Sequence, residues 1–569
     1  MPTEAQRLFL LTIAIGGVCG LAAVAFHLTI SLLENRLIEP AMRAPGRAWI
    51  FWTILTPAVG GLICGALLQY VVPGARGSGI PQVKAAFASP SAVVPLRDAV
   101  GKFLVGSLQI GSGASLGREG PTVQICAGIA SFLGRLVGVS AKSQRRLIPV
   151  GVAAGIAAAF NAPIAAVTFT IEEIVGSLDQ AVLSGVIVAA ALAAVIERSV
   201  LGESAVFTVP GSYGFRHASS LILYAAIGLA AAGASIVFTE SLLWLRARFR
   251  QLTILPTWVR PSIGGLLTGV LAVVALAALG SEGVTGGGYG ALGQTLNGLV
   301  AWRVMLGLCV LKLFATVFSY SSGGAGGIFA PALFIGGTLG GAIGTLNITL
   351  FDHADEPVGA FALVGMGAVF AGVIRAPITS VLIIVEMTGG YSLILPLMIA
   401  NMTAYVIARR FRVQSIYEAL LEQDGVKLQA LRGERVETLT IGALLRGERS
   451  LTLAPETPAQ EVLVLCRDAR ERHSYPVVHE SGRLLGIVTS EELGILISSP
   501  ELGPVTTAVD LMRPAVSVRA EDDLATAIEK MLENGVRELA VTDADGRFLG
   551  VVDDKGVSRA YKDNGTTRI

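Results

Sequence analysis

Long apolar runs recur along the chain as far as about residue 412. They lie near residues 9–33, 50–72, 122–138, 146–171, 181–196, 222–244, 262–280, 303–318, 328–350, 358–374 and 377–408. A helix needs about 20 residues to cross the hydrocarbon core of a bilayer, and several of these runs are shorter or are interrupted by Gly or Pro. Broken helices of this kind are expected where the chain ends inside the membrane and lines a site. The alternative is a bundle in which Gly only allows close helix contact.

The apolar part contains two related halves, roughly residues 1–200 and 215–412. Offsets of 210 and 214 residues align Lys102 with Lys312, Gly117 with Gly327, Pro121 with Pro331, Ala162-Pro163 with Ala376-Pro377, and Glu172 with Glu386. Repeated halves with broken helices at matching positions are typical of transporters whose site lies between the halves. The sequence alone leaves a parallel and an inverted repeat equally open.

A basic cluster, Arg409-Arg410-Phe411-Arg412, ends the apolar pattern and predicts a cytoplasmic exit. A polar connection near residues 422–436 leads to a tail that repeats as well. Each tail unit has the pattern of an approach strand, an amphipathic helix, a strand, a turn with Gly and a further strand. The tail is therefore predicted to be a pair of small α/β units.

Composition separates the same two regions. Of the 569 residues, 15% are charged and 53% are hydrophobic, and residues 413–569 carry 44 of the 85 charged residues. The first 412 residues have a net charge of +9 and the tail has −8. These values exclude a disordered chain and a wholly soluble enzyme. The five Cys show no CxxC spacing and the five His are scattered, so neither a metal site nor a disulfide framework is predicted.

Three glycine-rich segments precede apolar helical runs: GSGIP (77–81), GREGP (117–121) and GGIFAP (326–331). Each places free backbone N–H groups at the start of a helix, where the helix dipole adds partial positive charge. Several such helix starts that converge inside a membrane could bind a halide without a full positive charge, and an over-basic site would hold its ion too tightly to conduct.

Three carboxylates in apolar surroundings are candidates for proton chemistry. Glu119, within GREGP, could occupy an anion's place at a helix start. Protonation would neutralise the carboxylate and leave that place to the transported ion. The alternative is a structural pair with Arg118. Glu172 has the repeat mate Glu386, which favours a structural role. Glu173 has no acidic mate, which suits a proton relay, and the alternative is a solvated interfacial acid.

One motif indicates a different chemistry. Gly113-Ala-Ser115-Leu-Gly117 fits the GxSxG pattern of a nucleophile elbow, which requires a preceding strand and a partner histidine. The flanks here have a helical pattern, so an intramembrane serine hydrolase is a remote alternative. No GxxxxGK[ST] motif is present, which argues against ATP-driven transport.

The segments GSGIP, GREGP, FNAP, GGIFAP and IYEALL together resemble the CLC family of chloride channels and proton–chloride exchangers, in the family's order. The resemblance covers about residues 5–425. It implies an all-α polytopic membrane domain over residues 1–425, built as an inverted repeat of many tilted, uneven helices. It also implies a homodimer in which each subunit has its own ion path.

The resemblance assigns anion-binding roles to four residues. Ser78 in GSGIP is similar to the central anion-binding serine, and Tyr417 in IYEALL to the tyrosine whose hydroxyl meets the same ion. Ile328 and Phe329 in GGIFAP match the residues that offer backbone N–H groups. Serine in GSGIP implies chloride rather than fluoride, and proline there would have implied nitrate.

The resemblance also assigns two proton roles. Glu119 matches the gating, external proton glutamate, and Glu173 matches the internal proton glutamate of exchangers, where channels usually have an apolar residue. Gln82 and Lys84 depart from the pattern, because some bacterial exchangers carry acids there. This change alters the charge of the inner vestibule.

The tail resembles a tandem pair of CBS domains, at about 437–497 and 505–565. Such pairs often bind adenosine nucleotides, and Thr489 and Glu492 lie near the position of the ribose-contacting acid. Asp553 stands where Thr or Ser would be usual in the second unit, and the acidic tail repels phosphate. An adenosine nucleotide is therefore a candidate ligand, and a dimer-stabilising module is the alternative.

Taken together, the sequence predicts a proton-coupled chloride antiporter, with a passive voltage- or pH-gated chloride channel of the same fold as the first alternative. A CBS-gated divalent-cation channel is disfavoured because repeated intramembrane acids are nearly absent. The expected partners are chloride, protons, the lipid bilayer and a second copy of the chain, with no nucleic acid, no metal and no required cofactor. The expected location is a prokaryotic plasma (inner) membrane, with the CBS tail in the cytoplasm.

Overall fold

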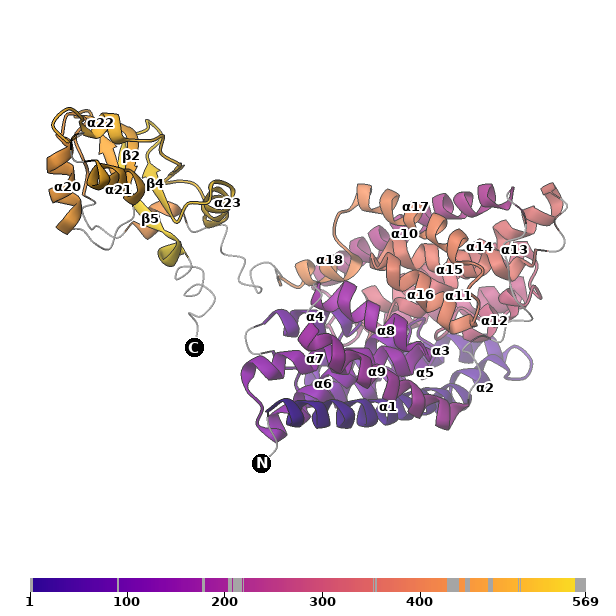
Figure 1. Ribbon diagram of the computed structural model, residues 1–569. Helices are drawn as coiled ribbons and strands as arrows, with labels where there is room; N and C mark the ends of the chain where they lie inside the picture. Colours follow the sequence, from indigo (N-terminus) through magenta and orange to yellow (C-terminus); the bar gives the residue numbers. More distant parts are fainter. Residues whose placement is uncertain are drawn as a thin grey trace. The chain divides into compact units, whose positions relative to one another are not determined.

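The chain divides into two units, Met1–Leu428 and Gln429–Ile569, which are described separately (Figure 1). The computed structural model describes residues 4–89, 92–176, 180–202, 207, 217, 219–351, 353, 356–426, 440–445, 451–468, 474–499, 501 and 503–557. Most of the connection expected at 422–436 and the end of the second tail unit lie outside these residues.

The apolar runs of the first half form helices, as the pattern predicts. These elements are α1 (Glu4–Arg36), α2 (Ile38–Met42), α3 (Ala48–Tyr70), η1 (Pro73–Ala75), α4 (Ile80–Ala88), α5 (Leu96–Gly111), α6 (Glu119–Val137), α7 (Ala141–Phe160), α8 (Pro163–Phe169), the π-helical turn η2 (Thr170–Val175) and α9 (Gln180–Leu201). The 9 residues of α4 cover only about 14 Å, so this helix ends inside the unit rather than crossing it.

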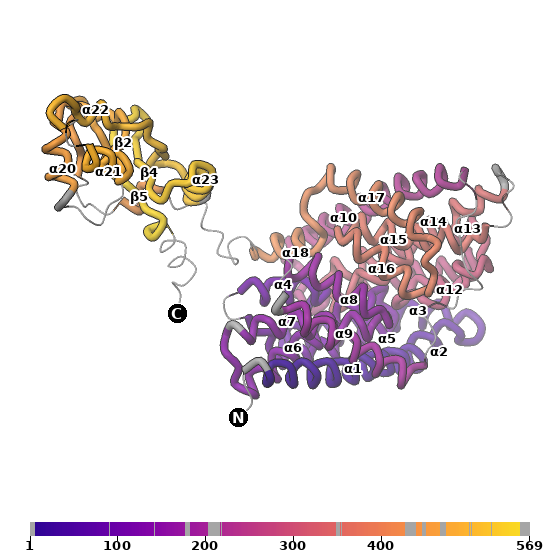
Figure 2. Tube along the Cα trace, viewed as in Figure 1, coloured from indigo at the N-terminus to yellow at the C-terminus, as the bar shows by residue number. Residues whose placement is uncertain are grey.

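The second half repeats this order. Its elements are α10 (Ser220–Gln251), α11 (Arg260–Val274), η3 (Ala275–Leu279), α12 (Tyr289–Leu296), α13 (Trp302–Ser321), α14 (Phe329–Phe351), α15 (Val358–Ile374), α16 (Pro377–Thr388), α17 (Ile394–Phe411) and α18 (Ile416–Gln423). The early helices α1, α5, α6, α7 and α9 gather on one side of the unit, and α10, α14, α15 and α17 gather on the other (Figure 2). Among the described residues, 8 helices are long and apolar enough to cross a membrane.

The repeat-related helices α8 and α16 show how the halves are related. The carboxylate of Glu386, near the end of α16, accepts hydrogen bonds from the first turn of α8, and Glu172, just after α8, accepts from the first turn of α16. The donors are the N–H groups of Ile164 (3.0 Å), Ala165 (2.7 Å), Ile378 (3.2 Å) and Thr379 (2.8 Å). The two mates therefore run in opposite directions, which makes the repeat an inverted one. The structural role predicted for Glu172 is confirmed.

Part of the glycine content does serve close helix packing. A Cβ on Gly336 of α14 would lie 2.2 Å from the carbonyl oxygen of Gly365 on α15. No side chain fits at that distance, so the two helices approach each other through backbone atoms. The small-residue interpretation is thus correct for this helix pair, while other glycines build the site described below.

The tail unit contains two small sheets with separate cores. In the first, β1 (Ser474–Val478) pairs antiparallel with β2 (Leu484–Thr489), and the helices are α20 (Ala459–Asp468), α21 (Ser490–Ser498) and α22 (Ala508–Leu511). In the second, β3 (Ser517–Arg519) pairs in parallel with β4 (Glu538–Thr542), which pairs antiparallel with β5 (Phe548–Asp553). Helix α23 (Leu524–Asn534) joins β3 to β4, and η5 (Ile441–Leu444) packs onto this second core. The predicted order of strand, helix, strand, turn and strand is present in the second sheet, whereas in the first Leu453 forms only an isolated bridge with Val477 in place of the approach strand.

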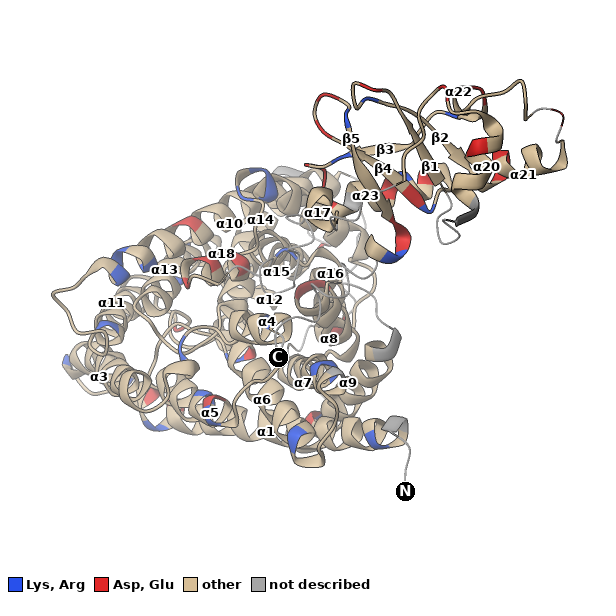
Figure 3. Cartoon of the chain, turned by 90° about the vertical axis from the view of Figure 1, so that its left-hand side faces the viewer, with Lys and Arg blue, Asp and Glu red and all other residues tan. Residues whose placement is uncertain are grey.

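Charge is distributed as the composition predicts. Figure 3 shows the helices of the first unit mostly in tan with scattered blue and red positions, whereas acidic and basic positions are frequent in the tail. The few buried charges of the first unit are therefore informative about function.

Candidate functional site

The three glycine-rich segments meet in one hydrogen-bonded cluster. The N–H of Gly77 donates to Gly324 (2.9 Å), and the N–H of Gly326 donates back to Gly77 (3.1 Å). Gly117 and Gly327 exchange two hydrogen bonds of 2.7 Å. The starts of α4, α6 and α14 therefore converge, as an anion site built from helix N-termini requires.

Glycine is obligatory where GSGIP meets GREGP. Gly79 has a φ of 102°, a conformation that side chains disfavour. A Cβ on Gly120 would lie 2.4 Å from the carbonyl oxygen of Ser78 and 2.6 Å from its hydroxyl oxygen. The absence of a side chain at Gly120 lets Ser78 lie directly against the first turn of α6.

Two buried hydroxyl groups have no protein partner. Ser78, before α4, and Tyr417, on α18, are both 0% exposed, and among the described residues neither hydroxyl has a hydrogen-bond partner. The two hydroxyls approach each other without reaching hydrogen-bonding geometry. An unsatisfied buried hydroxyl costs roughly 1–3 kcal/mol, so such a pair indicates a ligand that accepts hydrogen bonds.

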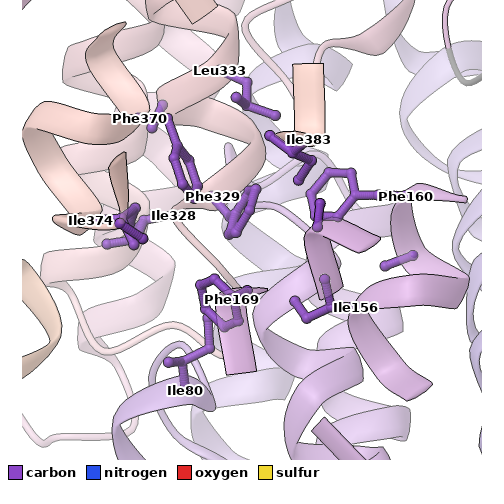
Figure 4. Packing of buried hydrophobic residues seen from close by; sticks show 14 of the residues in the cluster. Ile80, Ile156, Phe160, Phe169, Ile328, Phe329, Leu333, Phe370, Ile374 and Ile383 are labelled. Carbon is purple, nitrogen blue, oxygen red and sulfur yellow. The ribbon is translucent and has the colours of Figure 1, made fainter. Parts of the chain in front are cut away.

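Ile328 and Phe329 lie at the start of α14, where the first N–H groups of a helix have no partner within it. The Phe329 ring is held by three other rings, with centroids at 4.7 Å for Phe160, 5.9 Å for Phe169 and 4.3 Å for Phe370 (Figure 4). This packing fixes the backbone at the helix start and excludes water from it, which strengthens any electrostatic interaction there.

Glu119 is fully buried at the first position of α6. Its carboxylate accepts a hydrogen bond from the Tyr289 hydroxyl and a long one, 3.4 Å, from the N–H of Ala330 on α14. The carboxylate thus occupies an anion's place at a helix start, as predicted. Arg118 instead donates to the carbonyl of Ala159 (3.3 Å) and stacks over the Tyr289 ring. The alternative of a structural Glu119–Arg118 pair is not supported by any ion pair between them in the described part of the chain.

The repeat mates Lys102 and Lys312 are both fully buried and bind backbone carbonyls. Lys102 donates to Gly77 (2.7 Å), the residue before Ser78. Lys312 donates to Val284 (3.1 Å) and Gly286 (2.6 Å), in the segment that leads to Tyr289. Each lysine therefore holds carbonyl oxygens that would repel an anion.

Glu173 lies in the π-helical turn η2 and is nearly buried. It accepts a hydrogen bond of 2.8 Å from Lys84 on α4, and the same ammonium group donates to Glu418 on α18 (3.0 Å). Glu172, one position earlier, points to α16 instead. The two adjacent acids thus have separate partners, as expected of neighbours on a helix, and their roles stay predictions. The change of vestibule charge inferred from Lys84 did not include this cluster.

Two partners of the site were not found from the sequence. Glu418 directly follows Tyr417, and an acid beside a buried tyrosine was the available signal. Tyr289 is the first residue of α12 and follows a glycine-rich segment that carries no pattern of its own. Both residues have partners that are distant in sequence, Glu119 at 170 residues from Tyr289 and Lys84 at 334 residues from Glu418.

The hydrolase alternative is wrong. The Ser115 hydroxyl is fully buried and lies 3.0 Å from the hydroxyl of Thr316, and its backbone N–H bonds to Ser319. The flanks are helices rather than the strand that a nucleophile elbow requires. No group of three or more His, Cys, Asp or Glu that could hold a metal occurs within the described ranges.

In the tail, Thr489 and Glu492 form a capping box at the start of α21. Glu492 accepts from the N–H of Thr489 (2.8 Å) and from Arg513 (2.7 Å). Burial alone would raise the pKa of Glu492, but the hydrogen bonds from Thr489 and Arg513 outweigh it and hold the pKa below its usual value. The acid expected near a ribose is therefore already engaged within the protein.

Comparisons with known proteins complete this description. Residues 60–409 match the family model described as voltage gated chloride channel. The chain belongs to this family, the CLC family. Residues 448–493 and 508–563 match the CBS domain model. The protein is thus a multi-pass CLC membrane protein with a CBS pair, and it is not an enzyme.

Curated relatives include both kinds of CLC protein. A putative chloride channel protein, ClcB-like, of Ralstonia nicotianae is 35% identical over 72% of this chain and 97% of its own. An H(+)/Cl(-) exchange transporter, ClcA, of Vibrio campbellii is 33% identical over 74% of this chain and 90% of its own. Chloride transport follows from the family.

Solved structures support the same fold. A slow cyanobacterial Cl-/H+ antiporter aligns with a TM-score of 0.68 at 26% identity, over 74% of this chain and 98% of its own. A eukaryotic CLC transporter aligns with a TM-score of 0.65 at 20% identity, over 97% of this chain and 98% of its own. The predicted fold class, a helical CLC membrane domain with an α/β CBS pair, is confirmed.

Proposed function

We propose that this CLC protein exchanges chloride for protons. In this proposal the hydroxyls of Ser78 and Tyr417 and the N–H groups of Ile328 and Phe329 bind chloride. The support is the pair of unpartnered buried hydroxyls beside converging helix starts, a set of donors without a full charge directed at one place. Serine at position 78 supports chloride as the substrate.

Glu119 serves as the gate and external proton carrier. Its carboxylate is held by a hydroxyl and one long N–H bond, without a cation, so it competes with chloride for the start of α14. Protonation removes the charge that the helix start attracts. The neutral side chain then leaves, and chloride takes its place, which couples one proton to anion movement.

The observation that carries the coupling is the second buried carboxylate, Glu173. An uncoupled pore has no need of a second buried acid near the anion ligands, and burying one is costly. Tyr417 directly precedes Glu418, whose carboxylate shares the Lys84 ammonium with Glu173, so Glu173 belongs to the same part of the unit as the proposed anion ligand. Glu173 is therefore the internal proton glutamate in this proposal.

The test uses purified protein in sealed liposomes with an outward chloride gradient, held near zero voltage. Chloride efflux should drive uphill proton uptake, seen as a rise in external pH. Glu119→Gln should abolish proton uptake, because the amide cannot carry a proton, and Glu173→Gln should weaken it. Chloride efflux without any proton movement would refute the antiporter.

A passive chloride channel, gated by voltage or pH, remains the second candidate. The observation that favours it is the contact of 2.8 Å between Lys84 and Glu173, because an ion pair opposes protonation of the acid. In that case Glu119 would act only as a gate. The liposome experiment separates the two candidates, because a channel does not couple proton movement to the chloride gradient.

The remaining assignments are also proposals. We infer a homodimer, with the transport unit in a prokaryotic plasma (inner) membrane and the CBS pair in the cytoplasm. The basic residues Arg409 and Arg410 at the end of α17 support this orientation. Transport requires no cofactor. An adenosine nucleotide is a candidate ligand of the CBS pair, and this nucleotide must compete with Arg513 for Glu492.

A further inference from the structure

Three charged side chains from three elements share one buried contact. The Lys84 ammonium on α4 lies 2.8 Å from Glu173 on η2 and 3.0 Å from Glu418 on α18. The side chains of Lys84 and Glu173 are each 5% exposed, but that of Glu418 is 39% exposed. The cluster therefore connects a buried acid to a water-accessible one through a single cation.

The charges of this cluster do not balance when both acids are ionised. Two carboxylates share one ammonium, and like charges at such a distance in a poorly solvated site favour uptake of a proton by one of them. With one proton bound, the cluster is neutral. The carboxylate without the proton then pairs with Lys84, so the proton is bound by one acid or by the other, but not by both.

We propose that Glu418 is the water-facing proton carrier of the chain, that it exchanges protons with Glu173, and that Lys84 positions the two acids. This inference rests on the proposed antiport. When the proton moves from Glu418 to Glu173, the O–H bond of the Glu418 carboxyl breaks and an O–H bond forms on the Glu173 carboxylate. Lys84 remains an ammonium throughout, and its ion pair moves from Glu173 to Glu418.

The geometry allows this step without a large motion. Both carboxylates lie within 3.0 Å of the same nitrogen, so one water molecule is enough to bridge them. The hydroxyl of Ser415 accepts from the N–H of Glu418 (3.3 Å) and caps the first turn of α18. The proton carrier and the anion ligand Tyr417 are therefore consecutive residues on one capped turn.

Other charged groups around Glu173 are engaged elsewhere. Helix α8 has no titratable residue, and α4 has only Lys84. On η2 itself, Glu172 is bound to the start of α16, and from α18 the neutral Tyr417 faces Glu173. From α7, Arg145 stacks over Phe87 with its guanidinium 5.0 Å from the ring centroid. Glu418 is thus the exposed acid that shares a cation with Glu173.

The first experiment measures proton flux in the full chain in liposomes. Glu418→Gln should lower proton flux on the order of tenfold, because it removes the proton carrier, and should leave chloride affinity by calorimetry unchanged. Glu422→Gln is the matched control, an exposed acid on the same helix, and should behave as wild type. If Glu418→Gln lowers both fluxes, recovery of proton flux by Glu418→Asp supports the inference, and equal loss in both variants overturns it.

The second experiment separates positioning by Lys84 from a merely structural role. Without the cation, Glu173 favours its protonated form, so Lys84→Met should move the pH profile of proton flux to higher pH by about 1–3 units. Lys84→Arg keeps the charge and should restore the profile. An unshifted profile in Lys84→Met, or no rescue by arginine, would overturn the role of Lys84.

Wild type and Glu173→Gln distinguish the two levels of the proposal. If wild type moves no protons, the antiport itself fails. If wild type is coupled and Glu173→Gln is impaired while Glu418→Gln matches wild type, only the Glu418 carrier is refuted.

Discussion

Glu119 and Glu173 are both glutamates buried inside the membrane unit, yet their surroundings differ. Glu119 has only neutral donors, the Tyr289 hydroxyl and one N–H at 3.4 Å. Glu173 has a cation, Lys84, at 2.8 Å. A carboxylate held by neutral donors at a helix start can be replaced by chloride, whereas one held by an ammonium stays in place. The difference suits a mobile gate on one side and a fixed proton site on the other.

A second comparison shows that a helix start alone does not make a carboxylate mobile. Glu172 and Glu386 each bind two N–H groups of a helix start, at 2.7–3.2 Å. Glu119 binds one, at 3.4 Å. The number and length of these hydrogen bonds therefore distinguish the two helix caps from Glu119, the proposed gate.

The largest expected effect comes from removing the cation at Glu173. Lys84→Met should destabilise the protein by about 3 kcal/mol at pH 7, because a buried carboxylate loses its partner. The loss should shrink as pH falls, since the protonated acid needs no cation. Unfolding in detergent as a function of pH measures this, and Lys84→Met with Glu173→Gln should recover stability. A loss that is independent of pH would mean that Lys84 acts through packing.

Next in size is the loss of a permanent helix cap. Glu386→Ala and Glu172→Ala should each cost about 1.5–3 kcal/mol, because hydrogen bonds to a charged group are lost at a helix start. The two losses should be similar, as the residues are repeat mates. Denaturant unfolding gives the cost, and the proton-to-chloride ratio of the folded protein should stay unchanged. A changed ratio would mean that Glu172 or Glu386 takes part in transport and is not only a helix cap.

A smaller effect is expected at the gate. Tyr289→Phe removes one donor to Glu119, worth about 1–1.5 kcal/mol, so Glu119 should become protonated more easily. Chloride efflux activated by external acid should then shift to higher pH by about one unit. Tyr391→Phe, at a tyrosine that is 72% exposed, is the control. A shift toward lower pH would contradict the role of Tyr289 as a donor.

The smallest effect is expected in the tail, where an acid is held at the surface. The folded pKa of Glu492 is lowered, so its contribution to stability is present above its unfolded pKa and is lost as pH falls through the folded value. Glu492→Gln should cost about 0.5–1 kcal/mol at pH 7 and nothing in acid, where the carboxylate itself is protonated. Hydrogen exchange of the α21 amides in the full chain measures it. A loss of stability that persists in acid would mean that the introduced Gln side chain destabilises the unit for steric reasons and not through the missing charge.

The sequence by itself determined the features that depend on neighbouring residues. The apolar runs, the halves, the three glycine-rich segments and the strand order of the second tail unit all follow from local pattern and repeat, and each is present in the structure. Glu119 and Glu173 were found because a carboxylate stands in an apolar or glycine-rich segment, and Ser78 was found through the family resemblance of GSGIP. The anion and proton roles of these residues stay predictions that the experiments above test.

Only the tertiary structure decided how these segments meet. The inversion of the repeat follows from contacts between the ends of α8 and α16, which no local pattern encodes. The Tyr289 contact of Glu119 spans 170 residues, and the Lys84 contact of Glu418 spans 334. Periodicity reports which face of a helix is buried, but not which buried group faces it from a distant helix. Packing of the two halves makes that choice, and it decides which partners surround each buried acid.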